Sequence, residues 1–221
     1  MDSLLLQSFE EYFMMEFLWL VAAGVMIILS ILLFKDSKNA TTEKNKKLYL
    51  GIGSFILAYA LTRICFFFAD YYGAYQGLED TLEFLITIKL GYVISAIGLV
   101  ILLYIFEKEF VPTKYIFTIT AIISGVLYVF LPYNYMRLII YVFQPLVLVE
   151  ILYIYIYLAT KGIGELKKKA LYAIFTLIIF FMGIVLDIRS IADLHIVPSF
   201  VAPLLVMIGL ITYYLSQRSS E

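Results

Sequence analysis

Long apolar segments alternate with short polar stretches along the whole chain. Seven such segments can be separated, at residues 17–34, 48–69, 84–106, 115–132, 138–158, 170–188 and 196–216. Each is close to the roughly 20 residues that a helix needs to cross the hydrocarbon core of a bilayer. Apolar residues occupy every face of these segments, whereas the strands of a membrane barrel are short and alternate in polarity. The pattern predicts an all-α fold, a single polytopic transmembrane bundle of seven helices over residues 1–221.

The composition is that expected of a chain in contact with lipid. Hydrophobic residues make up 63% of the sequence and charged residues 15%, and the mean hydropathy is +0.97. Soluble domains are about half apolar and about a quarter charged. The net charge of −1 gives no basic surface for nucleic acid. Since Cys65 and His195 are the only cysteine and histidine, no disulfide framework, common metal site or conventional hydrolase arrangement can be built, and we expect neither an enzyme nor a cofactor.

The basic residues give the predicted bundle an orientation. Twelve of the sixteen Lys and Arg residues fall on alternate loops and on the C-terminal tail that continues this series. They are Lys35, Lys38, Lys44, Lys46, Lys47, Lys108, Lys114, Lys161, Lys167, Lys168, Lys169 and Arg218. Basic loops are retained in the cytoplasm, so a multi-pass protein of the cell membrane is predicted, with its N-terminus outside and its C-terminus inside. Termini on opposite sides require an odd number of crossings, which seven satisfies.

A weak internal similarity relates the two halves of the chain. A constant offset superposes Tyr49 on Tyr172 and Asp70 on Asp193. The third segment contains Ile97-Gly98-Leu99, and the seventh contains Ile208-Gly209-Leu210. These matches suggest a parallel 3+1+3 repeat, of a kind that small transporters use. The alternative is that apolar helices share residues by chance.

Two bases lie inside the apolar segments. Arg63 is seven residues before Asp70, and Lys89 enters the next segment to a similar depth, about 10 Å from the outer face at helical rise. Placing a charge in the bilayer costs about 3 kcal/mol on insertion scales, so such cations tend to be paired or functional. We expect Arg63 to pair inside the bundle, with Asp70, Asp187 or a bound ligand. For Lys89 the alternative is that its side chain extends outward to the lipid headgroups.

Glu150 is the one acid in the middle of an apolar segment. It lies about 20 Å from the outer end of the fifth segment, too deep for a direct pair with Arg63. An ionised carboxylate cannot face lipid, so Glu150 either carries a proton or contacts a polar group of another helix. The functional interpretation is a carboxyl group that handles a proton or cation, or a ligand contact. Gln144, beside Pro145 in the same segment, is a further candidate because a proline kink with a polar neighbour often lines a cavity.

Three groups of membrane proteins resemble this layout in outline. Microbial rhodopsins share seven N-out spans, but they need a lysine in the seventh span for retinal, and residues 196–216 contain none. The 3+1+3 sugar transporters have a Pro-Gln pair in the first and fifth spans, whereas this chain has Gln144-Pro145 in the fifth and no proline in the first. The seven-span sensor regions that precede bacterial and archaeal signalling kinases are similar in size. Such fold-level likeness carries little functional weight and assigns the chain to no family.

Three functions stay open at this point. The first is a receptor- or sensor-like bundle that binds a small ligand in its outer half, at Arg63, Lys89, Asp187 and Asp70, and signals through a partner. The second is a small secondary transporter with Glu150 as its coupling carboxyl group. The third is a structural or assembly subunit whose intramembrane charges pair with another chain. Membrane lipid and another membrane or cytoplasmic protein are the expected partners.

Overall fold

Helices make up nearly all of the chain that the structure describes. The computed structural model describes residues 2–71, 73, 81–187, 197–198 and 200–218, without the side chains of 2–13, 133–134, 136–141, 144–145, 165–166 and 218. Its seven helices within these ranges are α1 (Asp2–Asn39), α2 (Glu43–Asp70), α3 (Leu82–Glu109), α4 (Ile116–Phe130), α5 (Tyr133–Lys161), α6 (Glu165–Leu186) and α8 (Val201–Arg218). Each predicted apolar segment corresponds to one of these helices, so the all-helical fold is confirmed in the described ranges.

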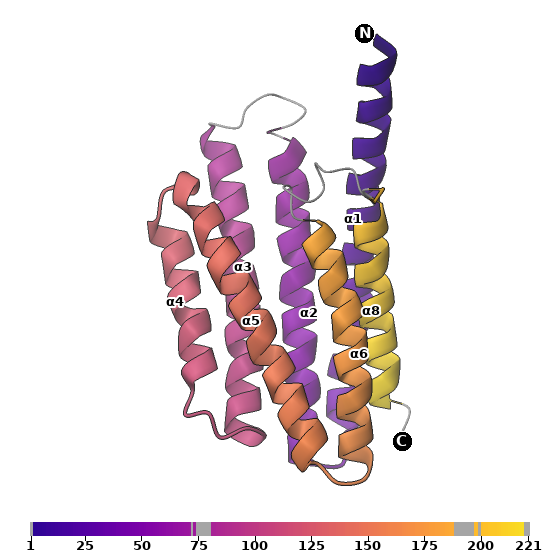
Figure 1. Cartoon of the computed structure of the whole chain (residues 1–221), viewed down its shortest axis with the longest axis vertical. Coiled ribbons are helices and arrows are strands. Elements are labelled where there is room, and N and C mark those ends of the chain that lie inside the picture. The colour runs from indigo at the N-terminus through magenta and orange to yellow at the C-terminus, as the bar shows by residue number, and fades with distance from the viewer. Residues whose placement is uncertain (1, 72, 74–80, 188–196, 199, 219–221) are drawn as a thin grey trace.

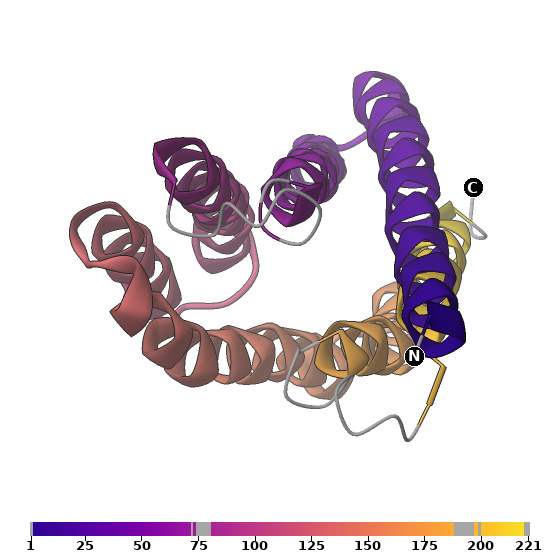
Figure 2. The same ribbon diagram turned by 90° about the horizontal axis from the view of Figure 1, so that it is seen from above.

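The helices stand side by side in a ring that follows the order of the chain (Figures 1 and 2). Each helix packs against its neighbours in sequence, and α1 packs against α8 to close the ring. The two chain ends lie at opposite ends of the bundle, and α1 projects past the other helices at the N-terminal end (Figure 1). The opposite end, here called the basic end, carries the α1–α2, α3–α4 and α5–α6 connections.

Turn-forming residues begin and end the helices. Thr42 caps the N-terminus of α2 by accepting a hydrogen bond from the Asn45 amide at 3.2 Å. Thr81 caps α3 in the same way, accepting from the Phe84 amide at 3.4 Å. Pro132 directly precedes α5, and because proline has no amide hydrogen it separates α5 from α4. The break between the fourth and fifth segments therefore lies where the sequence predicts it.

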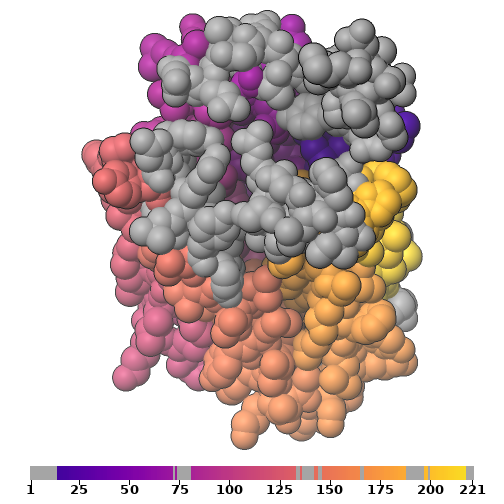
Figure 3. Space-filling view, turned by 45° about the horizontal axis from the view of Figure 1, so that its top comes forward, coloured from indigo at the N-terminus to yellow at the C-terminus, as the bar shows by residue number. Residues whose placement is uncertain are grey.

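Apolar side chains cover both the inside and the outside of the ring. The most deeply buried large ones include Trp19, Met26, Leu33, Ile56, Phe106, Ile154, Phe180 and Val206. Exposed large ones occur on every helix, among them Ile28, Leu61, Ile97, Ile122, Val149, Phe175 and Ile208. Side chains of α5 and α6 meet along one face of the space-filling view (Figure 3). Four helices are long and apolar enough to cross a membrane, at Met14–Asn39, Glu43–Asp70, Leu82–Glu109 and Lys167–Leu186.

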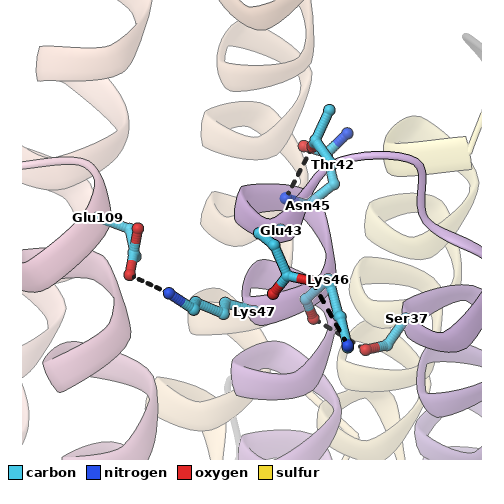
Figure 4. A network of polar contacts seen from close by, with 7 residues as sticks. All are labelled: Ser37, Thr42, Glu43, Asn45, Lys46, Lys47 and Glu109. Atoms are coloured by element: carbon cyan, nitrogen blue, oxygen red, sulfur yellow. Dashed lines mark hydrogen bonds and ion pairs between the residues drawn. The ribbon is translucent and has the colours of Figure 1, made fainter.

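Polar contacts join α1, α2 and α3 at the basic end (Figure 4). Lys47 Nζ on α2 donates to Glu109 Oε1 on α3 at 2.7 Å. The Ser37 hydroxyl on α1 donates to the backbone oxygen of Lys46 at 2.9 Å, and Lys46 pairs with Glu43 at 3.6 Å. Pairs between partly exposed side chains typically contribute no more than about 1 kcal/mol. These contacts therefore position the helix ends more than they stabilise the bundle.

Glycines allow the closest approaches between neighbouring helices. A Cβ atom at Gly98 on α3 would lie 2.5 Å from the Ala58 Cβ on α2. A Cβ atom at Gly209 on α8 would lie 2.7 Å from the backbone nitrogen of Phe180 on α6. Both separations are far shorter than van der Waals contact, so α2–α3 and α6–α8 can each pack this closely only through a glycine. Small residues have the same effect at helix contacts in membranes generally.

Replacement of Gly98 by alanine is expected to destabilise the protein by about 1–3 kcal/mol, because the added methyl group overlaps Ala58. Gly24→Ala is the matched control, because no atom lies within 4 Å of a Cβ built there. Alanine is also the better helix former, so this control should be as stable as the parent protein or more stable. Thermal unfolding of the two variants in detergent measures the difference, and equal midpoints would contradict the close packing at Gly98.

Candidate functional site

Arg63 and Asp187 form an ion pair across the interior of the ring. Arg63 Nη1 donates to Asp187 Oδ2 at 2.7 Å, and Nη2 donates to Oδ1 at 3.2 Å. Asp187 is the C-cap residue of α6, so the end of that helix sets its carboxylate opposite Arg63 on α2. The Arg63 side chain is 10% exposed and that of Asp187 is 23% exposed. Two parallel, charge-assisted hydrogen bonds to a largely buried guanidinium group are a strong and directional link.

The Trp19 ring on α1 stacks against the guanidinium group of this ion pair. The Arg63 guanidinium carbon lies 3.3 Å from the centroid of the Trp19 ring and 5.8 Å from that of Phe66. A guanidinium group stacked on an indole face gains a cation–π attraction of about 1–2 kcal/mol when it is shielded from water. Trp19 itself is 1% exposed, and its Nε1 has no hydrogen-bond acceptor among the described residues. Buried indole N–H groups usually have a hydrogen-bond acceptor, so this unpaired donor is unusual.

Glu16 and Tyr59 complete the group around Arg63. Glu16 is buried and lies one turn before Trp19 on α1, near enough to interact electrostatically with Arg63, Asp187 and Asp70. Tyr59 lies one turn before Arg63 on α2, and its hydroxyl group is near enough to interact electrostatically with Arg63 and Asp187. Residues three or four apart share a helix face, so α1 and α2 each turn two of these side chains inward. Glu16, Trp19, Tyr59, Arg63 and Asp187 are together called the Arg63 cluster.

Lys89 has a partner of its own, away from the Arg63–Asp187 pair. Its Nζ donates to the backbone oxygen of Val129 at 3.3 Å. Val129 is in the last turn of α4, where backbone carbonyls lack helical partners and carry the negative end of the helix dipole. A cation there stabilises the end of α4. Lys89 therefore links α3 to α4, whereas the sequence suggested that it joins Arg63 in one cluster.

Glu150 lies on the other side of the ring from the Arg63 cluster, on α5. It is 4% exposed, and its Oε2 has no hydrogen-bond partner among the described residues. The Thr120 hydroxyl of α4 lies beside its carboxyl group, and the charge of Glu107 on α3 acts on it. Gln144, the other candidate on α5, lies outside the residues whose side chains are described.

Several residues of these sites were given no role by the sequence. Glu16 precedes the first apolar segment, and Trp19 stood out only as the single tryptophan, although their spacing already places both on one helix face. Glu107 follows the third apolar segment and reads as a loop residue. It is buried, and its carboxylate accepts from the Phe117 and Thr118 amides at 3.0 and 2.8 Å. Glu107 thus caps the N-terminus of α4, and an acid shortly before a helix is a signal that the sequence contained.

Two small cavities lie inside the ring. One of about 30 Å³ is lined by apolar and aromatic side chains of α2, α3, α5, α6 and α8. The other, of about 40 Å³ near the basic end, includes Lys169 and Gln217 in its lining. Phe106 and Tyr155 line both cavities, and the Tyr155 and Tyr213 hydroxyl groups are hydrogen-bonded to each other. Each cavity has room for a few water molecules at most, so neither holds a ligand in this conformation.

Comparison with known proteins gives no relative from which a role can be transferred. The chain matches no protein-family model, no curated protein and no solved structure. What the site can do follows from its chemistry alone. A bidentate guanidinium–carboxylate pair can hold two helices together, and a guanidinium group fits the carboxylate of an incoming ligand as well as it fits Asp187.

Asp187→Asn is expected to destabilise the protein by about 3–5 kcal/mol, because it leaves the Arg63 charge buried without its counter-ion. The double variant Arg63→Met/Asp187→Leu should recover much of this loss, since apolar side chains of similar size often replace a buried ion pair without cost. Lys47→Met, at the partly exposed pair of the basic end, should cost no more than about 1 kcal/mol. Unfolding in lipid nanodiscs measures all three, and a double variant that is no more stable than Asp187→Asn would contradict this coupling.

Proposed function

We propose that the protein is a multi-pass receptor or sensor of the cell membrane, with its N-terminus outside and its C-terminus inside. The ligand is small, enters from the outside and binds at the Arg63 cluster, and the signal passes to a partner at the basic end. Four helices of membrane-spanning length support the location. The excess of Lys and Arg at the basic end supports the orientation. Chain ends at opposite ends of the bundle agree with both (Figure 1).

The observation that carries this proposal is the position of the Arg63–Asp187 pair between two helices whose backbones do not pack against each other. Another side-chain contact between them near the pair is the edge-on packing of Tyr59 against Phe180. In the ring, α2 and α6 lie on opposite sides (Figure 2), and each packs against other helices. The pair is therefore a latch between them. A signalling protein needs an element with two discrete arrangements whose balance a ligand can shift. A single ion pair at the end of α6 is such an element, because its loss frees one helix end and leaves the apolar packing intact.

The chemistry of the latch indicates the class of ligand. A carboxylate on the ligand replaces that of Asp187 on the Arg63 fork, so the charge beside the guanidinium group stays the same. The Trp19 indole N–H, which has no acceptor among the described residues, donates to the same ligand. A few well-placed polar groups in a mostly apolar site are the usual way in which such a site fixes the orientation of its ligand. The proposed ligand is therefore a small carboxylate.

Transport is the second candidate, and the two cavities inside the ring are the observation that favours it. Tyr59 packs edge-on against Phe180, which lines the cavity nearer the Arg63 cluster, with ring centroids 5.7 Å apart. A path from outside to inside would thus run past the latch, through both cavities and past Tyr155. Glu150 lines neither cavity, so the coupling carboxyl group of such a transporter would be Glu16. For an assembly subunit, Arg63 would have to face another chain, whereas here it is paired within this one.

We propose in addition that the chain contains a parallel 3+1+3 repeat. Gly98 on α3 and Gly209 on α8 occupy matching positions and make matching close approaches, to α2 and to α6. Tyr49 and Tyr172, the other matched pair, differ, since Tyr49 is buried and Tyr172 is 51% exposed. The support thus comes from the packing of the helix pairs and not from every superposed side chain.

Breaking the latch should change the distance between α2 and α6 at the outer end. Spin labels at Phe68 and Val185, which are 48% and 40% exposed, report this distance in a Cys65→Ser background. The parent protein should give one narrow distance, and Asp187→Asn a longer or broader one, because the helices lose their only polar link among the described residues. Identical distance distributions would refute the latch as a switch.

The ligand class is tested on the same labelled protein. Acetate, succinate and glutamate are added in turn, and the one that binds should shift the distance in the direction of Asp187→Asn. Arg63→Lys is the matched control, because lysine keeps the charge but lacks the planar fork. A carboxylate effect that survives in Arg63→Lys would place the ligand elsewhere. The carboxylate that binds is then offered in radiolabelled form to proteoliposomes. Its uptake under an imposed proton gradient would favour the transporter.

A further inference from the structure

A second buried polar centre lies between α3, α4 and α5 and shares no residue with the Arg63 cluster. It consists of Glu107, Thr118, Thr120 and Glu150, here called the Glu150 centre. Its two carboxyl groups lie near enough for the charge of Glu107 to act on Glu150, and no Lys, Arg or His among the described residues forms an ion pair with either. In a low-dielectric interior, charges of one sign need a counter-charge or a proton.

Glu107 already has its hydrogen bonds. Its Oε2 accepts from the Thr118 amide at 2.8 Å and from the Thr118 hydroxyl group. Its Oε1 accepts from the Phe117 amide at 3.0 Å and from the Thr113 hydroxyl group at 2.5 Å. Every one of these contacts gives a hydrogen to the carboxyl group, which is what an ionised carboxylate requires. Glu107 therefore acts as a fixed negative charge at the N-terminus of α4.

Glu150 differs from Glu107 because one of its carboxyl oxygens has no hydrogen bond among the described residues. Its side chain is buried, and Oε2 neither donates nor accepts a hydrogen bond among the described residues. Buried carboxyl oxygens usually have a hydrogen-bond partner, so this atom calls for an explanation. The Thr120 hydroxyl is in hydrogen-bond contact with the same carboxyl group and donates to the Ile116 backbone oxygen at 3.0 Å, so its lone pairs stay available. A carboxylate oxygen and a hydroxyl oxygen thus lie together with acceptor capacity unused.

We propose that Glu150 and Thr120 bind a monovalent metal cation of the size of Na⁺ between α4 and α5. Oxygen ligands suit such hard cations. One positive charge balances Glu150, and Glu107 adds to the attraction from α3 without giving up its own hydrogen bonds. The bound cation joins α5 to α4 as Lys89 joins α3 to α4. This site does not depend on the proposed receptor function, because the two centres have no residue in common.

Stability in the presence of different cations tests this proposal. Purified protein in neutral-lipid nanodiscs is unfolded thermally in NaCl, KCl or choline chloride at equal ionic strength, so that general screening is held constant. A cation that binds only the folded protein raises the midpoint in a saturable way, by about 2–4 °C when the gain is near 1 kcal/mol. We expect this rise in NaCl for the parent protein and its loss in Glu150→Gln.

Two controls separate binding from misfolding. Thr120→Val removes one ligand while keeping the carboxyl group, and should weaken the NaCl response severalfold. Thr160→Val is its match, because the Thr160 hydroxyl makes the same bond to its own helix, with Ile156, away from Glu150. Glu43→Gln, at a side chain that is 75% exposed, is the match for Glu150→Gln and should keep the full response.

Several results would overturn the proposal. One is a midpoint of the parent protein that is the same in NaCl, KCl and choline chloride, together with an undiminished stability of Glu150→Gln, which would assign a proton to Glu150. Another is a response to NaCl that Glu150→Gln or Thr120→Val retains in full. A failure of this kind leaves the distance measurements at the Arg63 cluster unaffected, so the two proposals stand or fall separately.

Discussion

A charge buried inside a helical bundle has little water to solvate it, and this constraint accounts for the polar contacts of the interior. Arg63 meets it with a bidentate carboxylate and an aromatic face. Lys89 meets it with a backbone carbonyl at the end of α4, and Glu107 with the amides at the start of the same helix. The two ends of α4 are thus each held by a charge from α3. Glu150 is the exception, because one of its oxygens has no partner in the described part of the chain.

The ring depends on these contacts for its geometry more than for its cohesion. Apolar packing is close to non-directional, so shape and polar links must decide which faces of the helices meet. Gly98 and Gly209 bring neighbouring helices together where a larger residue would not fit. Like the hydrogen bond between the Tyr155 and Tyr213 hydroxyl groups, the Arg63–Asp187 pair adds a directional contact across the ring. Loss of this pair would leave a bundle that still packs but with α6 free to turn at one end.

The helices were predictable from the sequence because long apolar segments separated by short polar stretches are typical of apolar helices. The helical rise per residue placed Arg63 and Lys89 at a similar depth, and the pairing of Arg63 with Asp187 was one of three open alternatives. The contact of Lys89 could not be predicted, since a backbone carbonyl leaves no trace in the side-chain pattern. Glu107 was missed because hydropathy assigns residue 107 to a loop, although its acid and the following helix start were visible together. Which acid faces which base depends on helix rotation, and apolar residues on every face carry no information about rotation.

The two polar centres divide the bundle between them. The Arg63 cluster draws on α1, α2 and α6, whereas the Glu150 centre draws on α3, α4 and α5. Because they have no helix in common, a change at one can reach the other only through the apolar core. Tyr59 touches Phe180, and both Phe180 and Tyr155 line the same cavity. Tyr155 follows Glu150 on α5 by little more than one turn. Side chains that line this cavity can repack without creating new empty space. Opening of the latch would therefore reach α5 at this cavity.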